Sequence, residues 1–440
     1  MPKNKSTTKS EYHLKVFSDR SELDLGKGKL EKFEEGRPSK EAVKRYTGIR
    51  AKFCDGFLTK AIDKCRNEPH KLDWSKLSRD HQESLRNLVS SVTSEVGRGI
   101  VGLTVLQLAV KTINRSQSIR LHKGGSGDFS WVEGISMRTL DRDFVTPALR
   151  SAGLLNLNRD GFMMTRSLAE NYPYSRVYKA AIRGAKNDWA TVLDGIEFGT
   201  LPAKQGLEFL LSQLINNANA FEKLSKNVTE LAKELVKLKK FKTSTDVLNL
   251  LLSHVAASDY KARVFEVLIH AFMQALEDLG ALNGGNVKPL SQMRSANKKH
   301  GNIGDVEVLD RNSIIESWDA KYGKPYLRDE LEELNDKLIA HSDVLKAGFV
   351  CSETPDQSDE IVERTKEISE LNRVEIEMLS IQDWVQKGEL RAISSGVKPN
   401  ELAISWLLAY IESLTQKRRT RAPIDEPCHQ WLASLVPLLT

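Results

Sequence analysis

Cysteine is scarce in this 440-residue chain: four cysteines lie far apart, with no pair separated by two residues. Cys54, Cys65, Cys351 and Cys428 therefore fit neither a disulfide framework nor a cysteine-based zinc site, and a reducing cytoplasm suits them best. Long apolar runs are also lacking. No stretch of about 18 apolar residues is present, so no membrane span is predicted. The first residues, MPKNKSTTKSEYHLKVF, have no apolar core of a secretory signal.

The composition is that of a folded protein. Hydrophobic residues make up 40% and charged residues 28% of the chain, which is enough apolar material for a real core. The formal net charge of +6 is mildly basic, which permits nucleic acid as a partner without requiring it. The length predicts two or three domains of ordinary size.

The sequence pattern divides the chain into four segments. Residues 1–40 are polar, rich in lysine and contain GKGK, which predicts a flexible basic arm, either a tail without a role or an arm that lies on DNA. Residues 41–200 are mainly helical and are interpreted below as a DNA-recognition domain. Residues 201–257 have long helical periodicity and predict a helical connector. Residues 258–440 change character and form the last domain.

The last domain alternates between helical and strand-like runs. A helix over 258–280 is followed by two strand-like runs, DVEVLD and SIIESWDAKYG. The remaining runs predict the order helix, strand, helix, strand, helix. This order favours a mixed sheet covered by helices.

Acidic side chains stand in the two adjacent strand-like runs, in GDVEVLDRNSIIESWDAKYG (304–323). Side chains alternate between the faces of a strand, so Asp319 shares a face with Lys321, Ser317 and Ile315. Asp305 reaches the same place if its strand pairs alongside. The stretch is either a solvated hairpin or a metal site. Two close carboxylates repel without a cation, and Mg²⁺ prefers carboxylate oxygens.

Two further acids of this stretch are harder to place. Glu307 and Glu316 are expected at exposed positions on the opposite face. By the alternation that places Asp305, Glu307 is alternatively a ligand. A lysine beside a metal orients a water or stabilises charge on a phosphate, which is the role expected of Lys321.

The conjunction of these motifs resembles the PD-(D/E)XK nuclease superfamily. Gly304-Asp305 stands for the first acid after a turn, in place of Pro-Asp, and Asp319-Ala320-Lys321 stands for the second motif, 14 positions later. The helix segment VFEVL offers Glu266 where family members often carry another acid. The alternative is that Glu266 is merely an acid on the helix surface. The resemblance covers residues 258 to about 390.

The resemblance implies an α/β (α+β) fold with a mixed-sheet nuclease core. It further implies that Glu266, Asp305 and Asp319 hold Mg²⁺ and that Lys321 assists the nucleophile and the charged transition state. The substrate of such an enzyme is double-stranded DNA, and its reaction is the hydrolysis of phosphodiester bonds.

The run ISMRTLDRDFVTPALRSAGLLNLNRDGFMMT looks like a winged helix-turn-helix, with a hairpin over residues 154–165 as the wing. The expected buried stripe consists of Leu140, Phe144, Ala148, Leu149 and Ala152. The expected DNA-contacting residues are Arg138, Arg142, Thr146 and Arg150 on the helix and Arg159 on the wing. Pro147 predicts either a kink or a second short helix capped by Thr146. Winged helices also serve as protein-binding modules.

A basic loop between Lys288 and His300 leads into Asp305. Lys298 and Lys299 in this loop are candidates for phosphate contacts, which supply affinity rather than sequence choice. The alternative is a solvated loop without a ligand.

A DNA reader joined to a metal nuclease resembles a type II restriction endonuclease. That resemblance implies a homodimer, because both strands must be cut, and a cognate DNA methyltransferase in a bacterial or archaeal cytoplasm. Two alternatives remain. One is a modification-dependent, phage-defence or transposon nuclease of the same superfamily, and the other is a non-catalytic winged-helix DNA-binding protein.

Overall fold

The computed structural model describes residues 12–26, 28–92, 97–123, 129–155, 157, 159–290, 302–417 and 426–440. The chain forms two compact units, Met1–Ala220 and Phe221–Thr440. Their boundary lies inside helix α8 (Ala203–Lys237), within the segment expected to be a connector. In the described ranges, every helix is too short or too polar to cross a bilayer.

The first unit opens with a small antiparallel sheet, which corrects the expectation of a flexible arm over residues 1–40. Strands β1 (His13–Val16), β2 (Arg20–Asp24) and β3 (Leu30–Glu34) pair in the order β1-β2-β3, and residues 1–11 lie outside the described residues. Leu23 and Phe33 pack with Trp131 in a separate apolar cluster. At least half of the residues in each short strand are polar, so the alternation of apolar and polar residues was not visible in the sequence.

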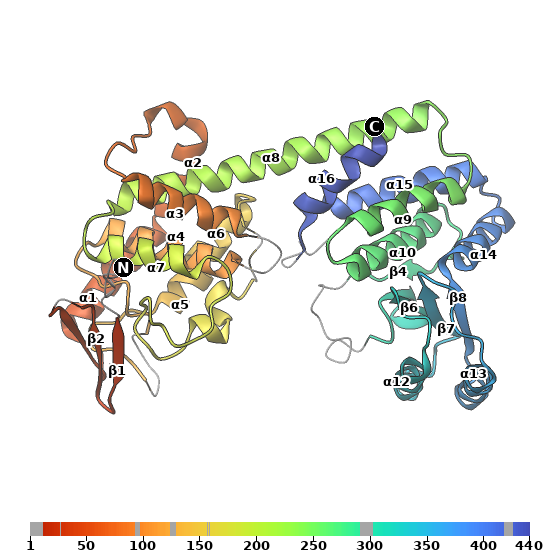
Figure 1. Cartoon of the computed structure of the whole chain (residues 1–440), viewed down its shortest axis with the longest axis horizontal. Helices are drawn as coiled ribbons and strands as arrows, with labels where there is room; N and C mark the ends of the chain where they lie inside the picture. The colour runs from red at the N-terminus through yellow and green to blue at the C-terminus, as the bar shows by residue number, and fades with distance from the viewer. Residues whose placement is uncertain are drawn as a thin grey trace, which may run out of the picture. The chain divides into compact units, whose positions relative to one another are not determined.

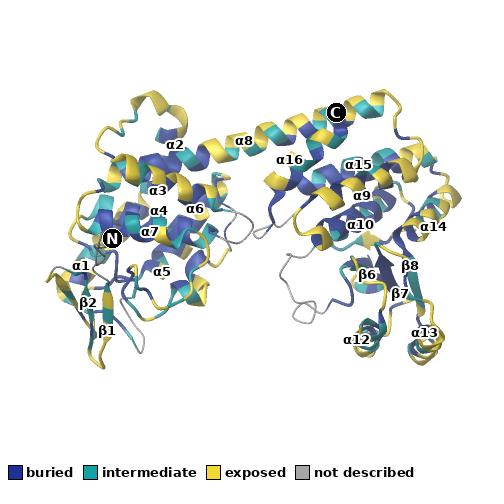
Figure 2. Cartoon of the chain, in the orientation of Figure 1, coloured by how far each residue is buried: buried dark blue, intermediate teal, exposed yellow. Residues whose placement is uncertain are grey.

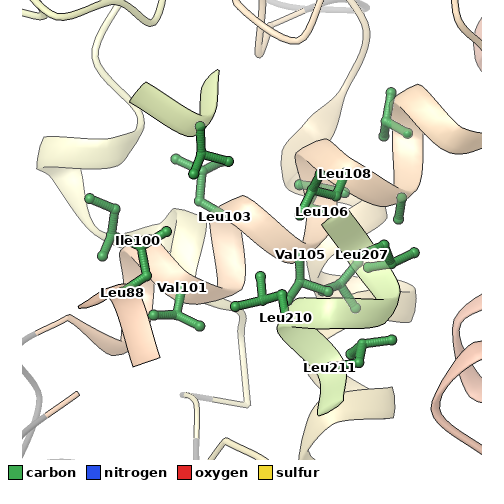
Figure 3. Close-up of a cluster of buried hydrophobic side chains, with 14 of the residues drawn as sticks. Leu88, Ile100, Val101, Leu103, Val105, Leu106, Leu108, Leu207, Leu210 and Leu211 are labelled. Carbon is green, nitrogen blue, oxygen red and sulfur yellow. The ribbon is translucent and has the colours of Figure 1, made fainter. Parts of the chain in front are cut away.

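The rest of the first unit is helical and is built around one buried helix. Every residue of α4 from Ile100 to Val110 is buried, because this helix is apolar on all sides. Leu207, Leu210 and Leu211 of α8 pack beside it (Figure 3). The helices of the first unit are α1 (Lys40–Cys54), α2 (Phe57–Asn67), α3 (Arg79–Ser90), α4 (Arg98–Ile113), α5 (Met137–Leu140), α6 (Thr146–Ser151), α7 (Lys186–Glu197) and the first part of α8.

The segment expected to be a winged helix is built differently. Helix α5 passes into a π-helical turn, η2 (Asp141–Val145), and then into α6, which has Pro147 in its first turn. The expected wing is wrong, because the described residues of 154–165 contain no strand and form the 3₁₀ turn η3 (Phe162–Met164) instead. The expected buried stripe is confirmed, since all its members lie in or against the core.

The second unit contains a five-stranded mixed sheet, β4-β5-β6-β7-β8 (Figure 1). Strand β5 pairs antiparallel with both β4 and β6, and β7 pairs parallel with both β6 and β8. The strands are β4 (Asn286–Val287), β5 (Val306–Asp310), β6 (Ser313–Lys321), β7 (Lys346–Cys351) and β8 (Glu375–Ser380). The expected mixed sheet covered by helices is confirmed.

Helices cover both faces of this sheet (Figure 1). On one face, α10 and α14 pack against Val306, Trp318 and Val350, and on the other, α12 and α13 pack against Phe349 and Cys351. Strand β7 and the first part of β5 are therefore buried, while the outer helix faces are exposed (Figure 2). The helices of the second unit, after the end of α8, are α9 (Ser244–Ala257), α10 (Lys261–Asp278), α12 (Arg328–Leu338), α13 (Asp359–Asn372), α14 (Ile381–Ser394), α15 (Pro399–Leu414) and α16 (Cys428–Leu439).

Candidate active site

Asp305, the residue just before β5, lies opposite Asp319 on the neighbouring strand β6. The register of β5 and β6 pairs Val306 with Trp318, which places Asp305, one residue earlier, beside Asp319, one residue later. The backbone N–H of Asp305 donates to the carbonyl of Trp318 over 3.0 Å. The N–H of Ala320 donates to Oδ2 of Asp305, also over 3.0 Å. The sequence expectation that the two carboxylates come together is therefore met by the strand register.

Lys321 joins the pair on the same face of the sheet. Trp318 packs against Trp384 of α14, with ring centroids 5.8 Å apart, so the neighbouring Asp319 points to the face covered by α12 and α13. Nζ of Lys321 lies 2.9 Å from Oδ2 of Asp319. The same Nζ lies 5.9 Å from the ring centroid of Phe349, which is part of the apolar cluster on that face.

Ile315 departs from the expected alternation. A bulge shifts the pairing of β5 and β6 between Val308 and Leu309, and Ile315 packs with the α10 and α14 cluster instead of sharing the face of Asp319. A bulge inserts one additional residue into a strand and so breaks the period of two. The alternation of side chains expected from the sequence therefore holds only between the bulge and the end of β6, where Asp319 and Lys321 lie.

The electrostatics of the pair are unusual for carboxyl groups. Burial raises the pKa of Asp319 from 3.8 to about 7, and the charge of Asp305 and a hydrogen bond with it add to the rise. Lys321 opposes this shift but does not cancel it. Burial acts to lower the pKa of Lys321, yet the carboxylates of Asp319 and Asp305 raise it overall. The site therefore holds more negative charge than its lysine compensates.

Glu266 is paired with an arginine of its own helix. It lies on α10, which covers the opposite face of the sheet, and its carboxylate accepts from the guanidinium of Arg263. Arg263 also donates from Nε to Oε1 of Glu426 over 2.9 Å. Burial raises the pKa of Glu266, and Asp319 is only the last of the charges that contribute. The structure thus gives Glu266 an arginine partner, while the charge of Asp319 still acts on its carboxyl group.

Glu307 and Glu316 correct the expectation of exposed acids. Glu307 is 2% exposed and lies on the face of Asp305, where it accepts from Nζ of Lys288 over 2.6 Å. Glu316 is 9% exposed and lies on the other face, where Trp318 and Arg391 donate to it. Charged side chains become buried when a partner satisfies them, and neither partner is visible from strand alternation alone.

Glu330 of α12 is a site residue that the sequence reasoning missed. It lies on the face of Lys321, and its charge raises the pKa of that lysine. One carboxylate oxygen accepts from Lys324, while Oε2 is buried without a hydrogen-bond partner. The helical spacing from Leu327 and to Leu334, both buried, places Glu330 on the inner side of α12 and was the signal available in the sequence.

A divalent cation fits the pair for a physical reason. The raised pKa of Asp319 reflects two carboxyl groups held together in a buried place. Mg²⁺ is commonly bound by one or two carboxylates, with water and phosphate oxygens in its other positions. Within the described parts of the chain, no group of three or more His, Cys, Asp or Glu side chains is arranged to hold a metal. Asp305 and Asp319 are the two carboxylates that could hold such a cation.

The candidate DNA-contacting residues differ in how far they are exposed. Arg138, Arg142 and Arg159 are exposed. Thr146 is a wrong prediction, because it is fully buried and donates from Oγ1 to Oδ1 of Asp141 over 2.6 Å. Arg150 is half-buried and donates to the carbonyl of Leu157. The π-helical turn before Thr146 rotates this residue inward, which a regular helix would not do. Lys298 and Lys299 lie outside the described residues.

Neither the protein-family models nor the curated proteins with which the chain was compared gave a match. The site itself consists of two apposed carboxyl groups and one ammonium, held by two antiparallel strands. These residues and their geometry are the only basis for assigning a function.

Proposed function

We propose that this chain is a Mg²⁺-dependent endonuclease that hydrolyses phosphodiester bonds in double-stranded DNA. The observation that carries the proposal is the apposition of Asp305 and Asp319 across two strands, with Nζ of Lys321 2.9 Å from Asp319. Each group belongs to the motif that resembles the PD-(D/E)XK superfamily. The three groups lie at one end of strands that pair in the mixed sheet.

Asp305 and Asp319 are the residues that would hold Mg²⁺. A bound Mg²⁺ lowers the pKa of water and neutralises charge on the phosphate. Asp305 is fixed by the N–H of Ala320, so its carboxylate is oriented before substrate arrives. Lys321 supplies three hydrogen-bond donors for a phosphate oxygen or the attacking water, and its raised pKa keeps it charged at neutral pH.

The first unit supplies the DNA contacts in this proposal. Arg138, Arg142 and Arg159 are exposed, and arginine binds phosphates and pairs with guanine. Arg142 is held by Asp143 over 2.7 Å, so its guanidinium has a defined starting position. Sequence-specific binding together with cleavage of both strands makes a homodimeric type II restriction endonuclease the proposed class. Its host would need a methyltransferase that protects the same sequence.

Digestion of a plasmid of known sequence tests the proposal. The purified chain is incubated with the plasmid in Mg²⁺ and, separately, in EDTA. Discrete fragments in Mg²⁺ alone support a site-specific nuclease, and Asp319→Ala should lower the rate at least about 10²-fold. Asp310→Asn is the control, because Asp310 is an exposed acid at the far end of β5. A smear would replace the restriction assignment by a non-specific nuclease, and intact plasmid under all conditions would refute the enzyme.

A further inference from the structure

Glu307 is a buried acid two positions after Asp305, on the same face of the sheet. Its Oε1 accepts from the backbone N–H of Ile303 over 2.6 Å and lies 3.4 Å from the N–H of Gly304. Its Oε2 accepts from Nζ of Lys288 over 2.6 Å. The side chain thus reaches back along its own strand and holds the two residues that precede Asp305.

Lys288 extends these contacts to the neighbouring elements. Its Nζ also donates to Oδ1 of Asn302 over 2.8 Å, and its backbone N–H donates to the carbonyl of Glu307 over 2.8 Å. The carbonyl of Lys288 lies 2.9 Å from Nε2 of His270, which donates to it from α10. The group Lys288, Asn302 and Glu307 therefore ties β5 to α10 at the residues just before Asp305.

Gly304 shows that the backbone just before Asp305 has little freedom to move. A Cβ at this position would lie 2.7 Å from the carbonyl oxygen of Trp318 and 2.7 Å from Oγ of Ser317. Such distances are far below van der Waals contact, so β6 bounds Gly304 closely. The N–H of Gly304 also faces Oε1 of Glu307. The backbone just before Asp305 is consequently held by both β6 and Glu307.

We propose that Glu307 is a positioning residue for the Asp305–Asp319 pair, acting through the backbone of residues 303–304 and anchored by Lys288. This inference rests on the proposed function, because it concerns the same metal site. Groups behind metal ligands commonly set metal affinity by orienting those ligands, and their loss weakens binding by about 10–100-fold. A buried ion pair that serves folding alone would leave metal affinity unchanged.

Metal binding without DNA separates these two roles. Mn²⁺ binding to wild type and Glu307→Gln is measured by calorimetry, and stability by thermal unfolding in EDTA. Glutamine keeps an oxygen for the N–H of Ile303 but removes the charge that holds Lys288. We expect Glu307→Gln to bind Mn²⁺ about 10–100-fold more weakly. The Mg²⁺ concentration that gives half-maximal cleavage should rise by the same factor.

Glu316→Gln is the matched control. Glu316 is likewise a buried, ion-paired acid of this hairpin, but it binds Trp318 and Arg391 on the opposite face. It should lose stability without losing metal affinity. Equal Mn²⁺ affinity in wild type and Glu307→Gln would overturn the inference. Failure of wild type to bind Mn²⁺ at all would instead refute the proposed function.

Lys288→Gln keeps the test decisive if Glu307→Gln does not fold. The side chain of Lys288 is about one-third exposed, so its loss should disturb the core less. The variant leaves the bond from Ile303 to Glu307 in place and removes its anchor. Weaker Mn²⁺ binding, in the same direction but smaller than for Glu307→Gln, supports the inference, and unchanged binding contradicts it.

Discussion

Ionisation of Asp319 is unfavourable because of the groups immediately around its carboxyl group. Asp319 is partly buried beside Asp305, and one lysine compensates only part of the combined charge. A site that binds a cation is expected to tolerate this arrangement, because the cation removes the repulsion. Without the cation, the repulsion should appear as a pH-dependent loss of stability.

The first prediction concerns this loss in EDTA. The folded-state pKa of Asp319 is raised to about 7, so the folded chain keeps a proton that the unfolded chain releases near pH 4. The free energy of unfolding should therefore fall as the pH rises from about 4 to 7 and then level off. Asp319→Asn removes this dependence and should be more stable than wild type at pH 8, by on the order of 2 kcal/mol.

Urea unfolding at pH 5 and pH 8 measures the difference. Asp310→Asn serves as the control, since Asp310 is exposed at the other end of β5. Parallel pH profiles for wild type and Asp319→Asn would contradict the prediction.

The second prediction concerns Glu266. Because this carboxylate neutralises the buried Arg263, Glu266→Gln should lower the free energy of unfolding by about 1–3 kcal/mol. Its cleavage rate should stay within about tenfold of wild type, whereas Asp305→Asn should lose at least about 10²-fold. Cleavage assays at saturating Mg²⁺ measure both. Equal losses in the two variants would restore Glu266 as a metal ligand.

The sequence predicted the pair but not its surroundings. Asp305, Asp319 and Lys321 follow from strand alternation, which depends only on local spacing. Glu266 differs because its neighbour Arg263 is three positions away on the same helix and takes its carboxylate. The partners of Glu307 and Glu316 come from other elements, and side-chain partners at long range leave no pattern in a single sequence.

At the scale of elements, the sheet and its helices were predictable where periodicity is strong. Leucine recurs at 327, 331, 334 and 338, in α12 and just before it, all buried, and β7 after this helix is mainly apolar. The segment 136–165 was not predictable, because one buried acid reorganises it. Asp141 accepts from Thr146 and from the N–H of Met163 over 2.9 Å, and so ties the π-helical turn to the residues expected to form a wing.

The third prediction tests this tie through Gly161. Its backbone has φ of 93° and ψ of 157°, a region open essentially to glycine alone, and a Cβ would lie 2.4 Å from Oδ2 of Asp141. Gly161→Ala should lower the free energy of unfolding by roughly 3 kcal/mol.

Gly153→Ala is the control for backbone strain alone, because Gly153 has φ of +68° but nothing within 4 Å of its Cβ position. It should lose only about 1 kcal/mol. Chemical denaturation monitored by circular dichroism measures both variants. Equal losses would show that the contact with Asp141 contributes nothing.

At the scale of the whole molecule, each unit has its own cores. The large cluster around α4 draws only on residues of the first unit, and the cluster around α10 draws only on residues of the second. Units whose cores share no residue should unfold as separate cooperative transitions. The length predicted two or three domains, and the structure has two units. The boundary inside α8 was not predictable, because the helical pattern runs through it without interruption.

The fourth prediction is that calorimetry resolves two unfolding transitions that respond to different substitutions. Leu103 in α4 and Leu268 in α10 are both fully buried, and replacing either by alanine should cost about 2–5 kcal/mol. Each substitution should lower only its own transition, by roughly 5–15 °C. A single transition that moves with either substitution would mean that the two units unfold together.

The contacts of α16 have a consequence for how the second unit is made. Trp431, Leu432 and Leu435 lie in its core, and the carbonyl of Trp431 lies 2.7 Å from Nε2 of His254 in α9. The ribosome translates these residues after every other described element of the unit. The apolar surface that they cover therefore stays exposed until they are made. Polypeptides interrupted before α16 would expose that surface to proteases.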